Sequence, residues 1–323
     1  MTPVPEPVRI AVLGSGFIAA YHARAVSELP DGEVVAAANW RPESLAKLAE
    51  SFTIPRTTTD WRKLVGDPGI DAVVVTTPNS LHAEQAIAFL DAGQHVMVEK
   101  PMAMDVAEAD AMVAAAERAR ASLMVAHCWR FHPAVVALRD RIAAGELGEV
   151  VKTRGYGVHA KWGPSGWFVD PALAGGGALA DMGVHAIDTA RFLLGGPEPV
   201  RVCAAVGTRY SDHAVDDDAV LLISWSNGTN SVVESGWWQP YLGGLEAETE
   251  VYATGGYAQV FGYTEPPEPD YEHCPQSMYT AQMAEFCDAL REGRQPAPTG
   301  TDGRVVMQVV EDAYRSAAVL EPR

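Results

Sequence analysis

Two glycines and an alanine at a fixed spacing mark the first place where this sequence could bind a ligand. The apolar segment Val8 to Leu13 leads directly into Gly14, Gly16 and Ala19, the pattern G-x-G-x-x-A at the start of a helical stretch. The first glycine allows a tight turn, the second lets the backbone approach a pyrophosphate, and the alanine lets helix and strand pack closely. A helix N-terminus adds free N–H groups. The predicted dinucleotide contacts come from Gly14, Ser15, Gly16, Phe17 and Ile18.

The residues after the second predicted strand bear on the choice of cofactor. About 20 residues past the glycines, where an acidic side chain usually binds the adenosine ribose, stand Asn39, Trp40 and Arg41. An aspartate would repel a 2′-phosphate, whereas Asn39 does not, and Arg41 can pair with a phosphate. Trp40 offers a face for adenine, or is simply a surface aromatic. The pattern slightly favours NADP over NAD.

Two further segments place polar side chains at the ends of predicted strands. Thr77, Pro78, Asn79 and His82 follow one strand, and Glu99–Lys100–Pro101 follows the next. Ligands of open α/β sheets bind beyond the carboxyl ends of the strands, so both segments should face the cofactor. Asn79 and His82 fall where the nicotinamide half is expected, with helix capping an equal alternative for Asn79.

Short apolar segments alternate with amphipathic stretches through the first 145 residues or so. The expected strands cover residues 8–13, 34–38, 72–76, 95–98 and 123–126. The expected helices cover residues 17–29, 42–52, 80–92, 106–120 and 131–143. This alternation predicts a doubly wound α/β domain, in which helices cover both faces of a parallel sheet.

The pattern changes after Gly145–Gly148, where the helical periodicity ends at glycines. Strands are expected at residues 150–158, 200–208, 219–225 and 231–237, with a hairpin signal at residues 226–229. Helices are expected at residues 178–194, 279–291 and 303–319. We predict an α+β domain with a mostly antiparallel sheet. The expected domains are residues 1–127 and 128–323, with the boundary between residues 120 and 148.

The motifs, in this order, resemble the glucose-fructose oxidoreductase / inositol dehydrogenase / rhizopine catabolism family. The most specific marks are Glu99–Lys100–Pro101 and the segment from Gly175 to Asp188, together with Thr77–Pro78–Asn79 and the glycine motif. The resemblance covers nearly the whole chain. It implies a Rossmann domain followed by a domain whose open-faced sheet pairs subunits into a homodimer or homotetramer. It also implies an NAD(P)-dependent oxidoreductase that acts on a CH–OH group of a sugar, cyclitol or related polyol.

The resemblance assigns catalysis and substrate binding to Lys100, Asp181 and His185, and places Arg130 near the cofactor. Asp181 and His185 are four residues apart, so on a helix they share one face. An imidazole with an unperturbed pKa near 6.5 suits transfer of the hydroxyl proton. Lys100 would polarise the oxygen or share its proton with His185, and Asp181 would orient a hydroxyl. The sequence leaves open which of Lys100 and His185 accepts the proton.

A glycine-flanked loop rich in aromatic residues precedes this helix and is the predicted substrate wall. Flat aromatic faces pack on the C–H faces of sugars, and Lys161 would bond a hydroxyl or carboxylate. The alternative is that these aromatics only hold the loop against the sheet. The substrate contacts predicted here are Lys161, Trp162, Trp167 and Phe168.

Other functions compete with this interpretation. Asp181, His185 and Asp188 could be metal ligands, but the family works without a metal, so no metal site is predicted. A non-catalytic sensor of dinucleotide or sugar would not need Lys100, Asp181 and His185 together. A branch of the same family hydrolyses glycosides with a transiently used NAD.

Charge and composition exclude some classes of partner. The chain has 42 acidic and 24 basic residues, a formal net charge of -18, which disfavours nucleic acid as a partner. No apolar run reaches the roughly 18 residues of a membrane span. The start lacks a basic segment followed by an apolar one, so we expect no signal peptide and a cytoplasmic protein. The four cysteines contain no C-x-x-C pair, which argues against a zinc ribbon.

Overall fold

The chain divides into two compact units, each described here by itself. The computed structural model describes residues 3–4, 6–240, 246–262 and 274–320. The first unit consists of Met1–Cys128 and Gln276–Arg304, and the second of Trp129–Pro275 and Val305–Arg323. A late segment of the chain therefore returns to the first unit. The expected absence of a signal peptide rests partly on Met1, Thr2 and Pro5, which lie outside the described residues.

The first unit contains a six-stranded parallel sheet with the strand order β3-β2-β1-β4-β5-β6. This is the order of a dinucleotide-binding doubly wound sheet, and it confirms the predicted Rossmann fold. Strands buried on both faces read as continuous apolar runs, as in Ala72–Val75, where every residue is buried. The strands are β1 (Val8–Leu13), β2 (Gly32–Ala38), β3 (Thr57–Thr58), β4 (Ala72–Val75), β5 (His95–Val98) and β6 (Leu123–Val125).

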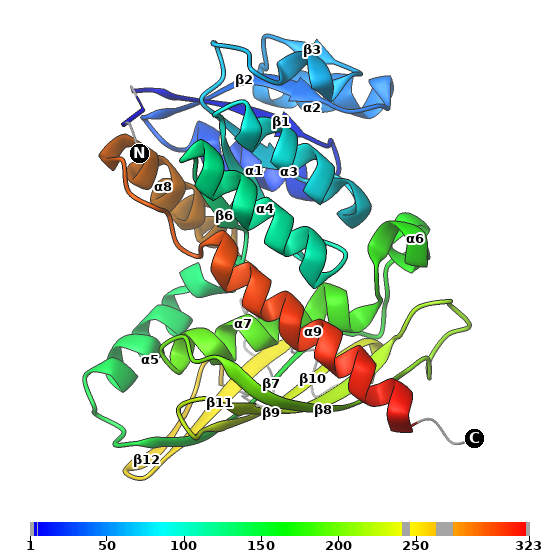
Figure 1. The fold of residues 1–323 in the computed structure, drawn as a ribbon, viewed down its shortest axis with the longest axis vertical. Helices are drawn as coiled ribbons and strands as arrows, with labels where there is room; N and C mark the ends of the chain where they lie inside the picture. The colour runs from blue at the N-terminus through cyan, green and yellow to red at the C-terminus, as the bar shows by residue number, and fades with distance from the viewer. Residues whose placement is uncertain (1–2, 5, 241–245, 263–273, 321–323) are drawn as a thin grey trace. The chain divides into compact units, whose positions relative to one another are not determined.

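Helices pack on this sheet through small and apolar residues. Ala19 and Ala23 of α1, for example, pack with Val12 of β1 and Ala37 of β2. Helix α8, from the late segment, lies beside α1, and α3 lies beside α4 (Figure 1). The helices are α1 (Phe17–Ser27), α2 (Pro42–Phe52), α3 (His82–Asp91), α4 (Val106–Ala119) and α8 (Gln276–Glu292).

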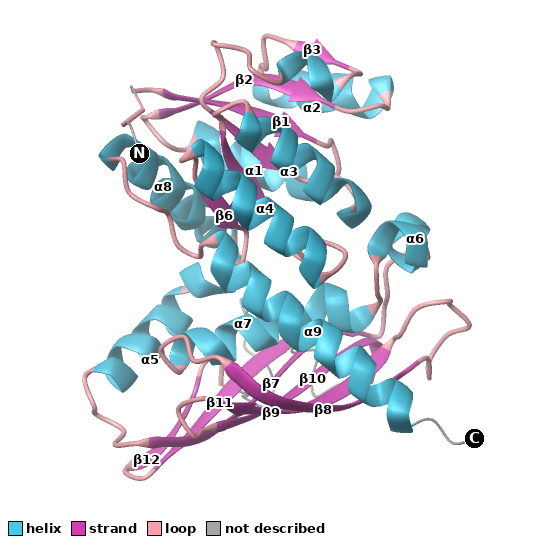
Figure 2. Ribbon diagram, viewed as in Figure 1, coloured by secondary structure: helices cyan, strands magenta, loops and turns pink. Residues whose placement is uncertain are grey.

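The second unit contains a six-stranded sheet with the order β12-β11-β7-β10-β9-β8. All neighbouring pairs are antiparallel except β7 with β10, so the predicted mostly antiparallel sheet is confirmed. Helices α5 (Pro133–Ala143), α7 (Val184–Leu193) and the part of α9 (Gly300–Leu320) that follows Arg304 lie on one side of the sheet (Figure 2). The strands are β7 (Val150–Ala160), β8 (Pro199–Gly207), β9 (Asp218–Trp225), β10 (Asn230–Gln239), β11 (Ala247–Ala253) and β12 (Gly256–Gln259).

Three features of the fold depart from the sequence-based expectation. Strands β3, β11 and β12 were not predicted, and neither was the short helix α6 (Pro171–Ala174). The helix expected over residues 178–194 instead begins with a π-helical turn, Leu179–Gly183, before α7. Such turns are rare and occur often at functional sites. Over the described part of the chain, we find no helix that is both long and apolar enough to cross a bilayer.

Candidate active site

The turn between β1 and α1 has the geometry that the glycine motif predicts. Gly14 has a φ of +101°, and a Cβ there would lie 2.4 Å from Oγ1 of Thr76, so only glycine fits. A Cβ at Gly16 would meet nothing within 4 Å, which leaves this side of the turn open. No side chain caps the N-terminus of α1, and its first turn carries no acidic residue. The turn therefore fits the pyrophosphate of a dinucleotide.

The predicted ribose-side residues form one polar network and one exposed stack. The Asn39 side-chain amide donates hydrogen bonds to the hydroxyls of Ser15 and of Ser44, the latter at 3.0 Å. Arg41 lies over the ring of Trp40 at 4.5 Å, and Trp40 is 67 % exposed. The hydrogen bonds join Asn39 to Ser15 of the glycine turn. At the end of β2, the stacked pair presents the aromatic ring of Trp40 and the positive charge of Arg41.

His82 links the two polar segments that follow β4 and β5. Its Nδ1 lies 2.9 Å from the carbonyl oxygen of Pro101, and its Nε2 lies 2.8 Å from that of Thr77. Burial lowers the pKa of His82, despite these two carbonyls. The Thr77 hydroxyl donates to Gln85, and Asn79 is buried. His82 thus ties together the backbone of both segments, and this bridging explains its presence without a cofactor contact.

A buried pair that the sequence analysis missed lies directly behind Lys100. Nε2 of His22, which is wholly buried, lies 2.7 Å from Oε1 of Glu99. Oε2 of Glu99 accepts a hydrogen bond from the backbone N–H of Lys100. Burial works to raise the pKa of Glu99, but the hydrogen bond with His22 and the charges of His22 and Lys100 outweigh it and hold the pKa low. An ionised Glu99 therefore fixes the backbone of Lys100, and the sequence signal was a lone histidine on an alanine-rich helix.

In the second unit, Asp216 clamps the start of the helical segment that carries Asp181. Its carboxylate accepts hydrogen bonds from the backbone N–H groups of Gly177 and Leu179, each at 2.8 Å, and from the Tyr314 hydroxyl at 2.7 Å. A Cβ at Gly177 would lie 1.8 Å from the carbonyl oxygen of Asp216. Burial raises the pKa of Asp216 in spite of its donors. The glycine run is thus needed for close backbone approach.

Asp181 lies in the π-helical turn and is 9 % exposed. Its Oδ2 accepts a hydrogen bond from Nε1 of the buried Trp237 at 3.1 Å. The same oxygen forms an ion pair with Nε2 of His159 on β7, at 3.4 Å. Neither residue could be assigned to the site from the sequence, because both contacts depend on how β7 and β10 lie beneath this turn.

His185 is brought close to a second tryptophan. Its ring stacks on that of Trp129, with centroids 4.7 Å apart and planes at 15°. Both residues are buried, at 6 % and 1 % exposure. The stacked indole fixes the plane of the imidazole, so a proton acceptor at this position would be held in one orientation.

Arg130, which the resemblance placed near the cofactor, is engaged within the second unit. Its Nε and Nη2 donate to the two carboxylate oxygens of Asp188, at 2.7 and 2.6 Å. Both side chains are buried. Asp188 was one of the three residues in the metal interpretation, and its two oxygens are directed at Arg130.

The aromatic residues of the predicted substrate loop differ in their contacts, and Trp162 contacts a partner of Asp181. Trp162 stacks on His159 with centroids 3.7 Å apart, whereas Trp167 and Phe168 stack on each other. Lys161 is exposed and has a φ of +64°. Trp162, one of the four predicted substrate contacts, is therefore linked to Asp181 through its stack on His159.

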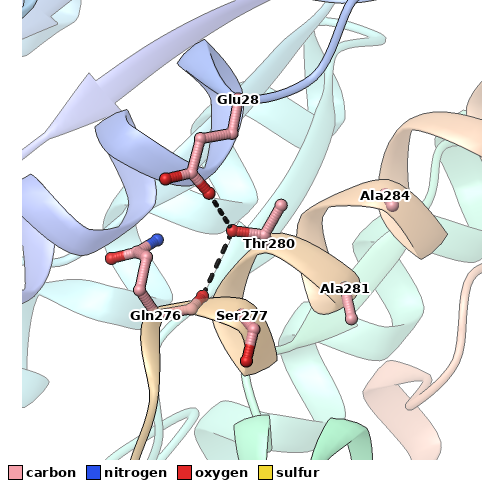
Figure 3. A pocket seen from close by; sticks show the side chains of 6 residues that line it. All are labelled: Glu28, Gln276, Ser277, Thr280, Ala281 and Ala284. Atoms are coloured by element: carbon pink, nitrogen blue, oxygen red, sulfur yellow. Dashed lines mark hydrogen bonds between the residues drawn. The ribbon is translucent and has the colours of Figure 1, made fainter.

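The surface also has two hollows, one in each unit. The first, of about 530 Å³, lies along α8 and the end of α1. There the Thr280 hydroxyl lies 2.5 Å from Oε2 of Glu28 and 3.1 Å from the carbonyl oxygen of Gln276 (Figure 3). The second, of about 290 Å³, is lined by Asp216 and Tyr314, which bond each other. The polar groups named here are bonded within the protein, so we assign no chemistry to either hollow.

Two family models match the chain. Residues 8–127 match the model of an oxidoreductase family with an NAD-binding Rossmann fold, and residues 135–259 match the GFO/IDH/MocA C-terminal domain. The first match covers all six strands of the parallel sheet, and the second covers all six strands of the mixed sheet.

Individual relatives match along almost the entire chain. Inositol 2-dehydrogenase of Rhizobium meliloti (strain 1021) is 31 % identical over 96 % of this chain and 97 % of its own. Among solved structures, GenD2 from gentamicin A biosynthesis, in complex with NAD, has a TM-score of 0.88 at 30 % identity, covering 97 % of this chain and 95 % of that one. Levoglucosan dehydrogenase in complex with NADH has a TM-score of 0.86 at 27 % identity, covering 97 % of both chains.

Proposed function

The chain belongs to the GFO/IDH/MocA family of oxidoreductases, and we propose that it transfers a hydride between a nicotinamide cofactor and a secondary alcohol or ketone of a sugar, cyclitol or related polyol. One observation carries the proposal. The open glycine turn, Thr77 and Lys100 follow β1, β4 and β5, which are neighbouring parallel strands, so all three stand at one edge of the sheet. Open α/β sheets bind dinucleotides at this end, beyond the carboxyl ends of the strands.

The proposed mechanism divides the work among three side chains. The nicotinamide, when bound, supplies the hydride acceptor or donor. Lys100, its backbone fixed by Glu99, stabilises the negative charge that develops on the substrate oxygen. His185, held flat against Trp129, accepts the hydroxyl proton during oxidation and returns it during reduction. Asp181 accepts a hydrogen bond from a substrate hydroxyl and so orients the reacting carbon.

We propose NADP⁺ as the preferred cofactor. Support comes from the end of β2, where Asn39 replaces an acidic residue and Arg41 lies exposed over Trp40. A guanidinium can pair with a 2′-phosphate, which NAD⁺ lacks.

A cytoplasmic location stays a prediction.

A binding titration followed by a polyol panel tests cofactor and reaction together. We expect NADP⁺ to bind more tightly than NAD⁺, and Arg41→Ala to weaken NADP⁺ binding by about tenfold with little effect on NAD⁺. Arg62→Ala is the matched control, because Arg62 also lies 4.5 Å over a tryptophan, Trp61. With the preferred cofactor, some polyol or ketosugar should change the nicotinamide absorbance.

Three results would count against these assignments. A clear preference for NAD⁺ would overturn the interpretation of Asn39 and Arg41 but not the reaction. Release of an aglycone from glycosides without net cofactor reduction would point to hydrolysis. Dinucleotide binding without turnover of any panel member would favour a sensor.

We further propose that the second-unit sheet pairs subunits through the face that α9 does not cover. On β9, Ala219, Leu221 and Ile223 are buried in the core with residues of α9. Side chains alternate along a strand, so Val220 and Leu222 point to the other face, where they are 44 % and 48 % exposed. Light scattering should report a dimer or tetramer, and Leu222→Lys should reduce its mass while circular dichroism stays unchanged. A monomeric wild-type protein would refute this assignment.

A further inference from the structure

Three titratable side chains in the second unit form a cluster that the mechanism does not yet explain. His159, at the end of β7, has its Nε2 3.4 Å from Oδ2 of Asp181 and its Nδ1 3.8 Å from Oε2 of Glu246. The first distance is that of a close ion pair, and the second is an electrostatic contact too long for a hydrogen bond. The three side chains are only 10 to 15 % exposed. We call Glu246, His159 and Asp181 the imidazole cluster.

Glu246 is rigidly placed in this cluster by two donors from the strand end and loop beside His159. Its Oε1 accepts hydrogen bonds from the backbone N–H of Ala160, at 2.9 Å, and from Nε1 of Trp162, at 2.6 Å. The ring of Trp162 also stacks on the imidazole, with centroids 3.7 Å apart. Glu246 therefore holds its second oxygen toward His159 without needing His159 for its own position.

We propose that His159 is a positioning residue that works as an imidazolium between two carboxylates, keeping Asp181 ionised and fixed for the substrate. The inference rests on the role proposed for Asp181 in substrate orientation. His159 acts through Asp181 and takes no proton from the substrate. Glu246 supplies the second negative charge that keeps the imidazolium charged where it is largely buried.

The charges around the ring agree with this assignment. Burial works to lower the pKa of His159, but the neighbouring carboxylates of Asp181 and Glu246 outweigh burial, and the pKa is raised. Burial works to raise the pKa of Glu246, but His159 and the N–H donors of Ala160 and Trp162 outweigh burial, and the pKa is lowered. Trp237 approaches Asp181 from β10 as a neutral donor, and the side chain of Lys161, two residues after His159 in sequence, is exposed.

The sign of the expected pH dependence follows from the raised pKa. A histidine with a raised pKa keeps its favourable pairing below its ordinary pKa and loses it as the pH rises through the raised value. Above that value Asp181 loses its cationic partner. The pH profile of kcat should therefore fall on its alkaline side, with a midpoint set by the pKa of His159. We call this fall the alkaline limb.

The first test follows the imidazole directly and does not depend on turnover. A ¹⁵N NMR titration of the full chain should show that the pKa of His159 is raised above the ordinary value of histidine. Glu246→Gln should lower this pKa by about one unit or more, because it removes a charge while keeping an amide oxygen for Ala160 and Trp162. Glu250→Gln, which removes the same charge from β11, is the matched control. Equal His159 titration in wild type and Glu246→Gln would overturn the proposal.

The second test separates positioning from direct substrate contact. In Glu246→Gln the alkaline limb of kcat should shift to lower pH with the pKa of His159. His159→Gln should lower kcat by roughly 10- to 100-fold, because Asp181 would no longer be held in place. The alkaline limb should disappear, because the group that titrates is gone. A rise of KM with kcat and its pH profile unchanged would show that His159 contacts substrate only. If no polyol is turned over, the proposed function fails, while the NMR result still reports whether the imidazole cluster exists.

Discussion

Replacing Lys100 with methionine should lower kcat for alcohol oxidation by at least about 10³-fold. The change removes a cation that stabilises the developing alkoxide and a group that can share its proton, each worth roughly two orders of magnitude or more. Methionine keeps an unbranched apolar stem, and the Lys100 backbone N–H bonded by Glu99 is unaffected. Steady-state kcat and KM, measured with saturating cofactor beside the dinucleotide Kd, check the prediction. A kcat within about tenfold of wild type would refute the assignment of Lys100 to the reacting oxygen.

A second substitution at the same position decides what Lys100 contributes. Arginine keeps the positive charge but does not give up its proton near neutral pH. If Lys100 acts by charge alone, Lys100→Arg should recover part of the loss; if it takes the hydroxyl proton, Lys100→Arg should be as inactive as Lys100→Met. Lys63→Met, at an exposed lysine of the same unit, should retain wild-type kinetics. The same pair of variants therefore addresses whether lysine or histidine is the proton acceptor.

Local patterns predicted the parallel sheet because its constraints are local. The run Val8–Leu13 is buried except for Arg9, and Gly14 directly after it must turn tightly against Thr76. Composition and spacing therefore indicate this part of the structure directly. The return of Gln276–Arg304 to the first unit has no such signal. Its amphipathic pattern predicts a helix but does not name the surface on which the helix packs. The short strand Thr57–Thr58 likewise exists only through its pairing with β2.

The site divides along the same line. Gly14, Gly16 and Lys100 were predicted because backbone conformation and strand ends can be read from the sequence. His22, His159 and Glu246 were not, because each matters through a contact with a residue on another element. His159 lies on a strand with no motif around it, and its partners Asp181 and Glu246 come from two distant segments. Arg130 was assigned from resemblance alone, and only the structure shows its bidentate contact with Asp188.

Asp188→Asn should destabilise the second unit by about 3–5 kcal/mol, since it leaves the buried Arg130 guanidinium without a counter-charge. The two side chains are 9 % and 1 % exposed, so solvent offers little compensation. Denaturant unfolding followed by tryptophan fluorescence gives the free energy, with Trp129 and Trp237 as buried reporters. Arg315→Ala breaks an exposed ion pair with Glu311 on α9 and should cost less than about 1 kcal/mol. If the two variants lost similar free energies of unfolding, burial would not account for the contribution of the Arg130–Asp188 pair.

The double variant Arg130→Met/Asp188→Leu distinguishes stability from positioning. Replacing a buried ion pair with apolar residues of similar size is often neutral, so most of the lost stability should return. Turnover should not return with it. Arg130 follows Trp129, and Asp188 lies one turn after His185 on α7, so the ion pair fixes the two segments whose rings stack. Apolar side chains pack without a fixed direction and would let that stack shift, and a displacement of about 1 Å can cost roughly 100-fold in rate. A double variant that is both stable and fully active would show that the pair serves folding alone.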